Sequence, residues 1–253
     1  MIDRAELSYP PLGTLKSVDK DIWLVDGPLI RFGMPWPKMP FPTRMTLIRL
    51  NGNDLFVHSP IAMSPRLKSE VEAVGTVRWI IGPNRLHYSW IPDWRTTFPA
   101  AGVYLAPRIR EQAKGRIDFA SLALNTSHGY PWDAEIATLP VAGSFMTEVV
   151  FFHHASRTLV LTDLIENFER HRVSWLMRWL ARLGGVLDPD GGMPLDMRFT
   201  FRERTGELRR AIETMIAWDP QRIILAHGRW YDRDAVEELR RAFRWLLKSY
   251  QRA

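Results

Sequence analysis

The chain has no cysteine, and this absence narrows the chemistry that it can perform. Disulfide bonds, thiolate nucleophiles and cysteine metal ligands are all excluded. Any metal ion must therefore be bound by histidine, aspartate, glutamate or asparagine side chains. The sequence also lacks a Gly-rich phosphate loop, a dinucleotide-binding fingerprint and a Gly-x-Ser-x-Gly motif, so nucleotide binding and serine nucleophilic catalysis are disfavoured.

Long apolar runs and clustered charge are missing as well. No run approaches the roughly 18 apolar residues of a transmembrane helix, and the first residues do not resemble a signal peptide, so we expect a cytoplasmic protein. The net charge is +6, but the arginines are spread along the chain, which disfavours a nucleic-acid partner. With 46% hydrophobic and 25% charged residues, the 253 residues are expected to form a single globular domain over 1–253.

The spacing of apolar residues predicts an alternation of strands and helices. Strands are expected over 22–26, 45–50, 55–58, 77–81, 103–106, 136–141, 148–153, 158–162 and 222–226. Helices are expected after Ser64-Pro65, over 90–98, 174–183 and 207–218, and from 235 to about 250. Both halves of the chain run from strands into helices, and a four-layer sandwich with helices outside two sheets would explain this order.

A proline-rich stretch over 34–42 separates the first two predicted strands. Four prolines forbid a helix and favour an extended, stiff loop. The wider segment 32–44, with Arg31 and Arg44 flanking its aromatic residues, could form a lid over a pocket for an anionic or apolar substrate. A structural strap is the simpler interpretation.

Four predicted strands are followed by a residue that can bind a metal or carry a proton, namely His58, His87, Asp163 and His227. Side chains at the ends of adjacent strands can converge on one edge of a sheet, where distant residues assemble a metal site. Asp163 directly follows an apolar run, so its charge should be partly buried and met by a metal, an arginine or a protonated histidine. His227 precedes a glycine, which permits a tight turn.

The order of these segments resembles the metallo-β-lactamase fold superfamily over roughly residues 22–229. The resemblance is carried by the strand before His58-Ser59, the segments 80–87 and 143–152, Thr162-Asp163, and Ala226-His227-Gly228. In the superfamily these places hold a strand ending in Asp, a His-rich metal motif, a Gly-His-Thr segment, a Gly-Asp pair and a Gly-His-Gly turn. The resemblance implies an α/β protein with a four-layer αββα sandwich of metallo-β-lactamase type.

The departures from this pattern indicate a degenerate metal site. Where the superfamily has His-x-His-x-Asp-His, this chain has one histidine, His87, within the segment 83–90. Ser144 stands at the middle histidine position, and His58 stands where the first strand usually ends in Asp. A two-metal centre is therefore not expected.

The residues that remain can bind at most one divalent ion, zinc or iron, through His87, Asp163 and His227. Three protein ligands and one open position suit a catalytic zinc, and two histidines with one carboxylate also suit Fe(II). His58 would help to move protons, because imidazole titrates near neutral pH, and Glu148 could be a further ligand or base. By the resemblance, the protein would be a hydrolase acting on a small ester or lactone. The alternative is a metal-free binding or scaffolding protein that keeps the fold without catalysis.

The predicted helix 174–183 carries an apolar stripe that includes Trp175 and Trp179, with arginines beside it. Such a helix can contact a membrane surface or cover the mouth of a pocket. A helix that faces the interior or forms a homodimer is commoner, so membrane contact is open but not favoured.

Two further histidines, His153 and His154, follow the apolar part of the predicted strand, which ends at Phe152. Strand alternation directs them to opposite faces, and we expect both at the surface.

Overall fold

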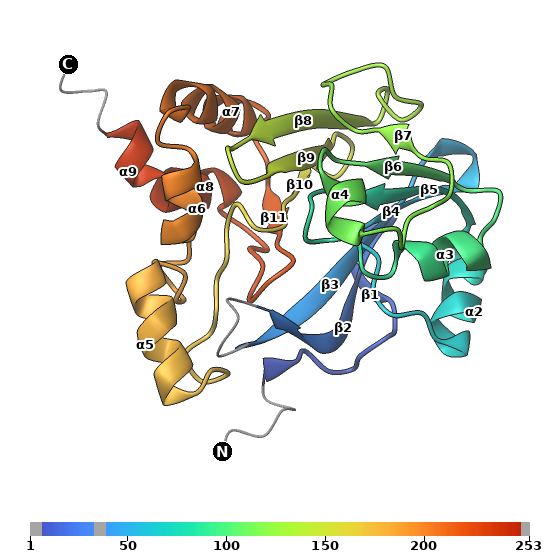
Figure 1. Ribbon diagram of the computed structural model, residues 1–253, viewed down its shortest axis with the longest axis horizontal. Coiled ribbons are helices and arrows are strands. Elements are labelled where there is room, and N and C mark those ends of the chain that lie inside the picture. Colours follow the sequence, from blue (N-terminus) through green and yellow to red (C-terminus); the bar gives the residue numbers. More distant parts are fainter. Residues whose placement is uncertain (1–6, 33–38, 249–253) are drawn as a thin grey trace. The chain divides into compact units, whose positions relative to one another are not determined.

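The described part of the chain, residues 7–32 and 39–248 of a computed structural model, holds two β-sheets built from consecutive stretches of sequence (Figure 1). The first sheet belongs to a unit formed by residues 1–125, and the second to a unit formed by residues 126–253. Each unit has its own helices. The assignment of 1–253 to one domain stays a prediction.

The first unit contains a seven-stranded sheet whose strands follow one another in sequence order. They are β1 (Lys16–Asp19), β2 (Ile22–Phe32), β3 (Met39–Arg49), β4 (Asp54–His58), β5 (Thr76–Gly82), β6 (Gly102–Leu105) and β7 (Leu122–Ala123). The first four strands are antiparallel neighbours, whereas β4 to β7 run parallel. The helices are α2 (Pro65–Val74), α3 (Ile91–Thr97) and α4 (Ile109–Ala113), with a 3-10 turn, η1 (Asn51–Asn53).

Local signals explain the elements that lead into and out of β4. Gly52 adopts φ +77° in the turn between the antiparallel strands β3 and β4, a conformation that glycine adopts without strain. Ser64 then begins α2, because its hydroxyl accepts a hydrogen bond from the Leu67 N–H at 3.1 Å. Leu67 and Val71 are buried on one face of this helix.

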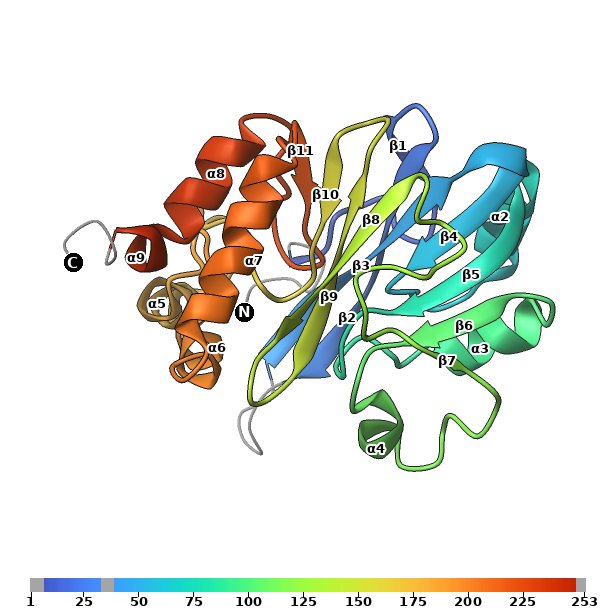
Figure 2. The same ribbon diagram turned by 90° about the horizontal axis from the view of Figure 1, so that it is seen from above.

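The second unit contains a four-stranded sheet in the order β11-β10-β9-β8. Its strands are β8 (Ile136–Ala142), β9 (Thr147–His153), β10 (Thr158–Val160) and β11 (Arg222–Ile224). Its helices are α5 (Trp175–Gly184), α6 (Leu195–Thr200), α7 (Thr205–Ala217), α8 (Ala235–Ala242) and α9 (Arg244–Leu247). The strands β8, β9 and β10 form antiparallel pairs, whereas β10 and β11 are parallel neighbours, and α7 contacts α8 (Figure 2).

The structure corrects two of the predicted element boundaries. Residues 39–42 belong to β3 rather than to a loop, while 34–38 lie outside the described residues. Pro40 and Pro42 are tolerated there because this part of β3 pairs with β2, and β4 pairs only from Thr46 onward. The predicted last helix is divided into α8 and α9, because Phe243 leaves helical geometry at φ −108° and ψ 19°.

Arg44 has a structural partner rather than a substrate-binding position. Its guanidinium lies 2.8 Å from an Asp26 oxygen, and both side chains are buried. Lys16 contacts the other Asp26 oxygen at 2.7 Å. The charge of Arg44 is thus matched by an acid on the neighbouring strand, which does not support its use in binding an anionic substrate.

Within residues 7–32 and 39–248, no helix is long and apolar enough to cross a lipid bilayer.

Candidate metal site

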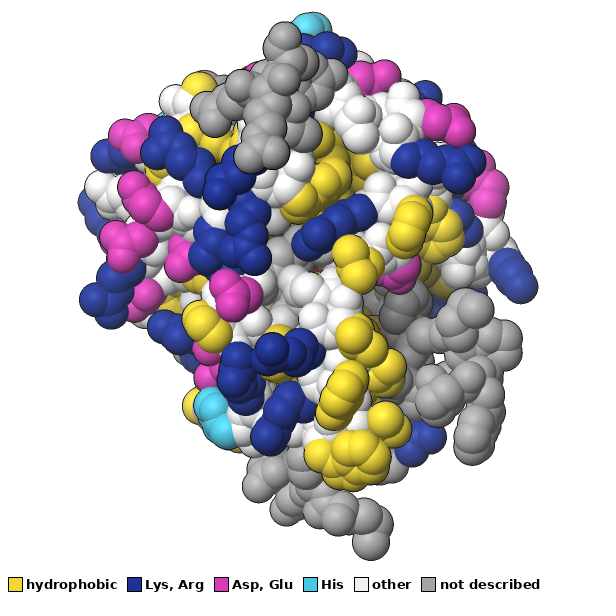
Figure 3. All heavy atoms as spheres, turned by 90° about the vertical axis from the view of Figure 1, so that its left-hand side faces the viewer, with side chains coloured by type: hydrophobic (Ala, Val, Ile, Leu, Met, Phe, Trp, Pro, Cys, Tyr) yellow, Lys and Arg dark blue, Asp and Glu magenta, His cyan; other side chains and the backbone are white. Residues whose placement is uncertain are grey.

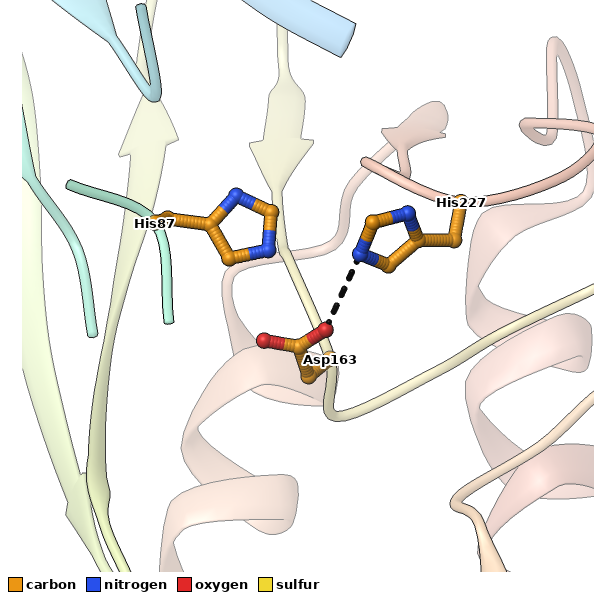
Figure 4. A group of neighbouring side chains, drawn as sticks. All are labelled: His87, Asp163 and His227. Atoms are coloured by element: carbon orange, nitrogen blue, oxygen red, sulfur yellow. Dashed lines mark ion pairs between the residues drawn. The ribbon is translucent and has the colours of Figure 1, made fainter. Parts of the chain in front are cut away.

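Asp163 and His227 follow two adjacent parallel strands of the second unit. The last residues of these strands, Val160 and Ile224, are paired, and each functional residue comes three positions later. The two side chains therefore leave the same edge of the sheet. The Nε2 atom of His227 lies 3.1 Å from Oδ1 of Asp163, and the two side chains point toward each other (Figure 4). Both are buried, so His227 is a partner for the buried charge expected at Asp163.

The turn that carries His227 is fastened to the segment that follows Asp163. The Asn167 N–H donates to the His227 carbonyl at 3.4 Å, and the Arg229 N–H donates to the Asn167 carbonyl at 2.8 Å. Between them, Gly228 has φ +84°, and a Cβ added there would lie 2.1 Å from the Asn167 carbonyl oxygen. Only glycine allows this approach, so the glycine after His227 is required by packing as well as by the turn.

Glu148, on β9, fixes the segment that carries Asp163. One carboxylate oxygen accepts the Thr162 N–H at 2.7 Å, and the other accepts the N–H groups of Asp163 at 2.8 Å and Leu164 at 3.0 Å. Burial, and then the Asp163 carboxylate, raise the pKa of Glu148 to about 7. Because both oxygens bind backbone donors, the contacts support a positioning role rather than that of a ligand or base.

Glu166 is a titratable residue near this site that the sequence did not single out. Its backbone N–H and carbonyl both pair with Gly192 at 3.0 Å. Burial raises the pKa of Glu166 to about 8; the charge of His227 opposes this shift, and that of Asp163 adds to it. The only signal of Glu166 in the sequence is an acid directly after the apolar pair Leu164-Ile165.

His87 belongs to the first unit, in the loop that follows β5. Asn84 closes this loop, because its Oδ1 accepts the N–H groups of Leu86 at 2.8 Å and His87 at 3.2 Å. The Nδ1 atom of His87 lies 2.7 Å from the Ser59 hydroxyl. Sequence reasoning missed this pair because the two residues are 28 positions apart.

His58 is the last residue of β4 and is buried, with only 2% of its surface exposed. Burial, and then the charge of His87, lower the pKa of His58 to about 3. The imidazole is therefore neutral at physiological pH, which disfavours the proton-carrying role suggested by the sequence. That role stays a prediction.

The expected surface position of His153 is wrong. His153 is buried, and its Nδ1 lies 2.8 Å from the Ser156 hydroxyl. This hydrogen bond gives the buried ring nitrogen a polar partner. His154 is exposed, as predicted.

The donor atoms of Asp163 and His227 lie slightly closer together than two ligands of one metal ion would. In a tetrahedral zinc site, bonds of about 2.0–2.2 Å place neighbouring ligand atoms about 3.3–3.6 Å apart. The observed separation of 3.1 Å is that of a direct ion pair or hydrogen bond, and a few tenths of an ångström of opening would bring the two atoms to ligand spacing. One imidazole nitrogen and one carboxylate oxygen are also donors that Fe(II) accepts.

Solved structures with similar coordinates show which fold this chain has. The metallo-β-lactamase DIM-1 matches with a TM-score of 0.60 and 11% identity, covering 93% of this chain and 96% of its own. The metallo-β-lactamase FIM-1 from Pseudomonas aeruginosa, in its mono-zinc form, matches with a TM-score of 0.57 and 13% identity. This match covers 93% of this chain and 95% of FIM-1. The metal-soaked Flv1 flavodiiron core from Synechocystis sp. PCC6803 matches with 0.62 and 11%, covering 94% of this chain and 61% of its own. The chain thus has the metallo-β-lactamase fold, as the resemblance implied.

The family is given by a sequence model described as a domain of unknown function (DUF4336). This model matches residues 33–180, which is more than half of the chain, so the chain belongs to that family. Among curated proteins, no match was found. The predicted likeness to the metallo-β-lactamase fold is therefore confirmed, and the family to which the chain belongs is this domain of unknown function.

Proposed function

We propose that this chain is a hydrolase-like metalloprotein that binds one divalent ion, zinc or iron, through Asp163, His227 and His87. The observation that carries the proposal is the buried pair of Asp163 and His227, 3.1 Å apart beyond two adjacent parallel strands. A bound ion would acidify a water molecule or polarise a substrate carbonyl. The third ligand, His87, lies in the first unit, and its participation is part of the proposal.

The chain's own residues would hold these ligands in orientation. The Ser59 hydroxyl engages Nδ1 of His87, so His87 would bind through Nε2. Glu148 fixes the backbone at Asp163 through three N–H groups. Asn167 fixes the turn that carries His227. The substrate would be a small ester or lactone, an expectation that rests on the fold.

Metal content per chain tests this proposal. Zinc, iron and manganese are measured in protein purified without chelator and again after saturating metal supply. We expect about one ion per chain, and its loss in Asp163→Ala and His227→Ala, since one ligand supplies much of the affinity of a small site. His153→Ala is the matched control, because it removes a buried histidine of the same sheet that contacts Ser156.

The same measurement on His87→Ala tests the third ligand. If metal content were unchanged in His87→Ala but lost in Asp163→Ala, a site without His87 would be indicated. A native protein that takes up no ion at saturating supply would contradict the proposal and favour the metal-free binding or scaffolding function.

The contact between Ser59 and His87 favours a second candidate function, in which a serine nucleophile is activated by a histidine base. The Ser59→Ala variant distinguishes the metal-dependent function from the serine-nucleophile function. If Ser59 orients a metal ligand, its loss should weaken metal binding by about 10–100-fold. If Ser59 is the nucleophile, its loss should abolish hydrolysis and labelling by a fluorophosphonate probe, with metal content unchanged.

A further inference from the structure

A second site is indicated by a pocket of about 390 Å³ in the second unit. Its lining comes from α5, α6, α8, α9 and the loop segments beside them, and includes neither Asp163 nor His227. The volume suits a small molecule. The charged side chains that line it are Arg170, Arg182, Arg198, Arg241, Arg244 and Asp190.

The positive charge of this pocket exceeds the negative charge that faces it. Among the described residues that line it, Asp190 is the one acid, and its carboxylate lies 3.8 Å from Arg241 and 3.9 Å from Arg244. Arg241 is also held from outside the lining by Glu238. An anion that entered here would offset the repulsion among the remaining guanidinium groups.

Arg198 is placed to bind such an anion. Its Nε donates a hydrogen bond to the Met193 carbonyl at 2.9 Å, and its Cζ lies over the Trp245 ring, 5.2 Å from the ring centroid. These two contacts hold the guanidinium in position. Burial, and then the charge of Arg244, lower the pKa of Arg198. A pre-positioned guanidinium beside another arginine is a typical arrangement for binding phosphate oxygens.

The rim of the pocket is apolar and exposed. Leu183 and Leu195 line it and are 60% and 41% exposed, respectively. They adjoin the apolar stripe of α5, where Trp175 and Trp179 are 74% and 63% exposed. The expectation that this stripe faces the interior is therefore wrong, and the homodimer alternative stays a prediction. On the face of the molecule formed by these helices, Lys and Arg side chains gather beside a band of hydrophobic ones (Figure 3).

We propose that this pocket binds a phosphate monoester that carries an apolar group, with the phosphate among the arginines and the apolar group at the leucine rim. The phosphate would accept hydrogen bonds from Arg182, Arg198 and Arg244. The phosphate monoester could come from a soluble molecule or from the headgroup of a lipid such as phosphatidic acid. A soluble phosphate monoester and a lipid headgroup offer the same phosphate chemistry, and the two experiments below distinguish them.

Calorimetric titration with hexyl phosphate, inorganic phosphate and neutral hexanol tests the binding of a soluble ligand. We expect hexyl phosphate to bind more tightly than inorganic phosphate and hexanol not to bind. Arg182→Gln and Arg244→Gln should each weaken binding by at least about tenfold, because each removes a charge-assisted hydrogen bond. Arg178→Gln is the matched control, since Arg178 lies on the same helix as Arg182 and does not line the pocket.

Flotation with phosphatidylcholine vesicles, with and without phosphatidic acid, tests the membrane source. Binding that requires phosphatidic acid and is lost in Arg182→Gln and Trp179→Ala would support a lipid headgroup as the ligand. Binding of hexyl phosphate alone, with the expected arginine dependence, would support a soluble ligand. The proposal is overturned if neither phosphate source binds, or if Arg178→Gln weakens binding as much as Arg182→Gln does.

Discussion

Replacing Gly228 by alanine would separate the two residues of the candidate metal site that the structure places together. The new Cβ would lie 2.1 Å from the Asn167 carbonyl oxygen and 2.4 Å from its carbon, which are backbone atoms that cannot turn aside. The distance from this Cβ to the Asn167 oxygen must grow from 2.1 Å to about 3.4 Å to become a normal van der Waals contact. The backbone would therefore have to move by about 1.3 Å. His227 is the adjacent residue and would move with the turn.

Two effects lower the free energy of unfolding in Gly228→Ala. A φ of +84° costs an L-residue about 1–2 kcal/mol, and relieving the overlap costs about 1–3 kcal/mol more. We therefore expect Gly228→Ala to lower the free energy of unfolding by about 3 kcal/mol. Metal sites tolerate errors of only about 0.2 Å in ligand distance, so metal affinity should fall by at least about 100-fold.

Urea unfolding of the metal-free protein and a metal titration measure these two effects. Gly129→Ala is the matched control, because Gly129 has φ +94° and nothing lies within 4 Å of an added Cβ. The control should show only the backbone strain and should bind metal normally. If Gly228→Ala were as stable as Gly129→Ala and bound metal equally well, the close approach at Asn167 would not position His227, and the reasoning would be refuted.

Three further predictions concern other parts of the chain. Asp26→Ala should lower the free energy of unfolding, measured in urea, by about 3–5 kcal/mol, because it leaves the buried Arg44 without its carboxylate. Burial alone would raise the pKa of Glu70, but hydrogen bonds, first of all from the Leu15 N–H, lower it below 4.5. The stability that Glu70 contributes is therefore present above pH 4.5 and lost as the pH falls through its lower folded-state pKa, so Glu70→Gln should be destabilised at pH 7 but little changed in strong acid. Trp179→Ala should alter the melting temperature little, because an exposed side chain typically contributes within about 0.5 kcal/mol; a large drop would show that the ring is covered in solution.

Much of the fold could be predicted because its signals are local. Ser64-Pro65 marks the start of α2, and Asn51-Gly52-Asn53 marks the turn before β4, through backbone preferences that act over a few residues. Apolar runs likewise predicted β5 and β9. The prolines at 40 and 42 misled the prediction, because their effect depends on whether a neighbouring strand needs their missing N–H groups.

The order of residues along the chain already places Asp163 beyond β10 and His227 beyond β11. That these two strands are parallel neighbours is a property of the folded chain, and it brings the two side chains to 3.1 Å across 64 positions of sequence. The roles of Glu148 and Asn167, which hold the backbone beneath this pair, were likewise invisible. The physical reason is that periodicity and turn preference act between near neighbours, whereas ligand spacing, burial and the resulting pKa values arise from contacts between distant segments.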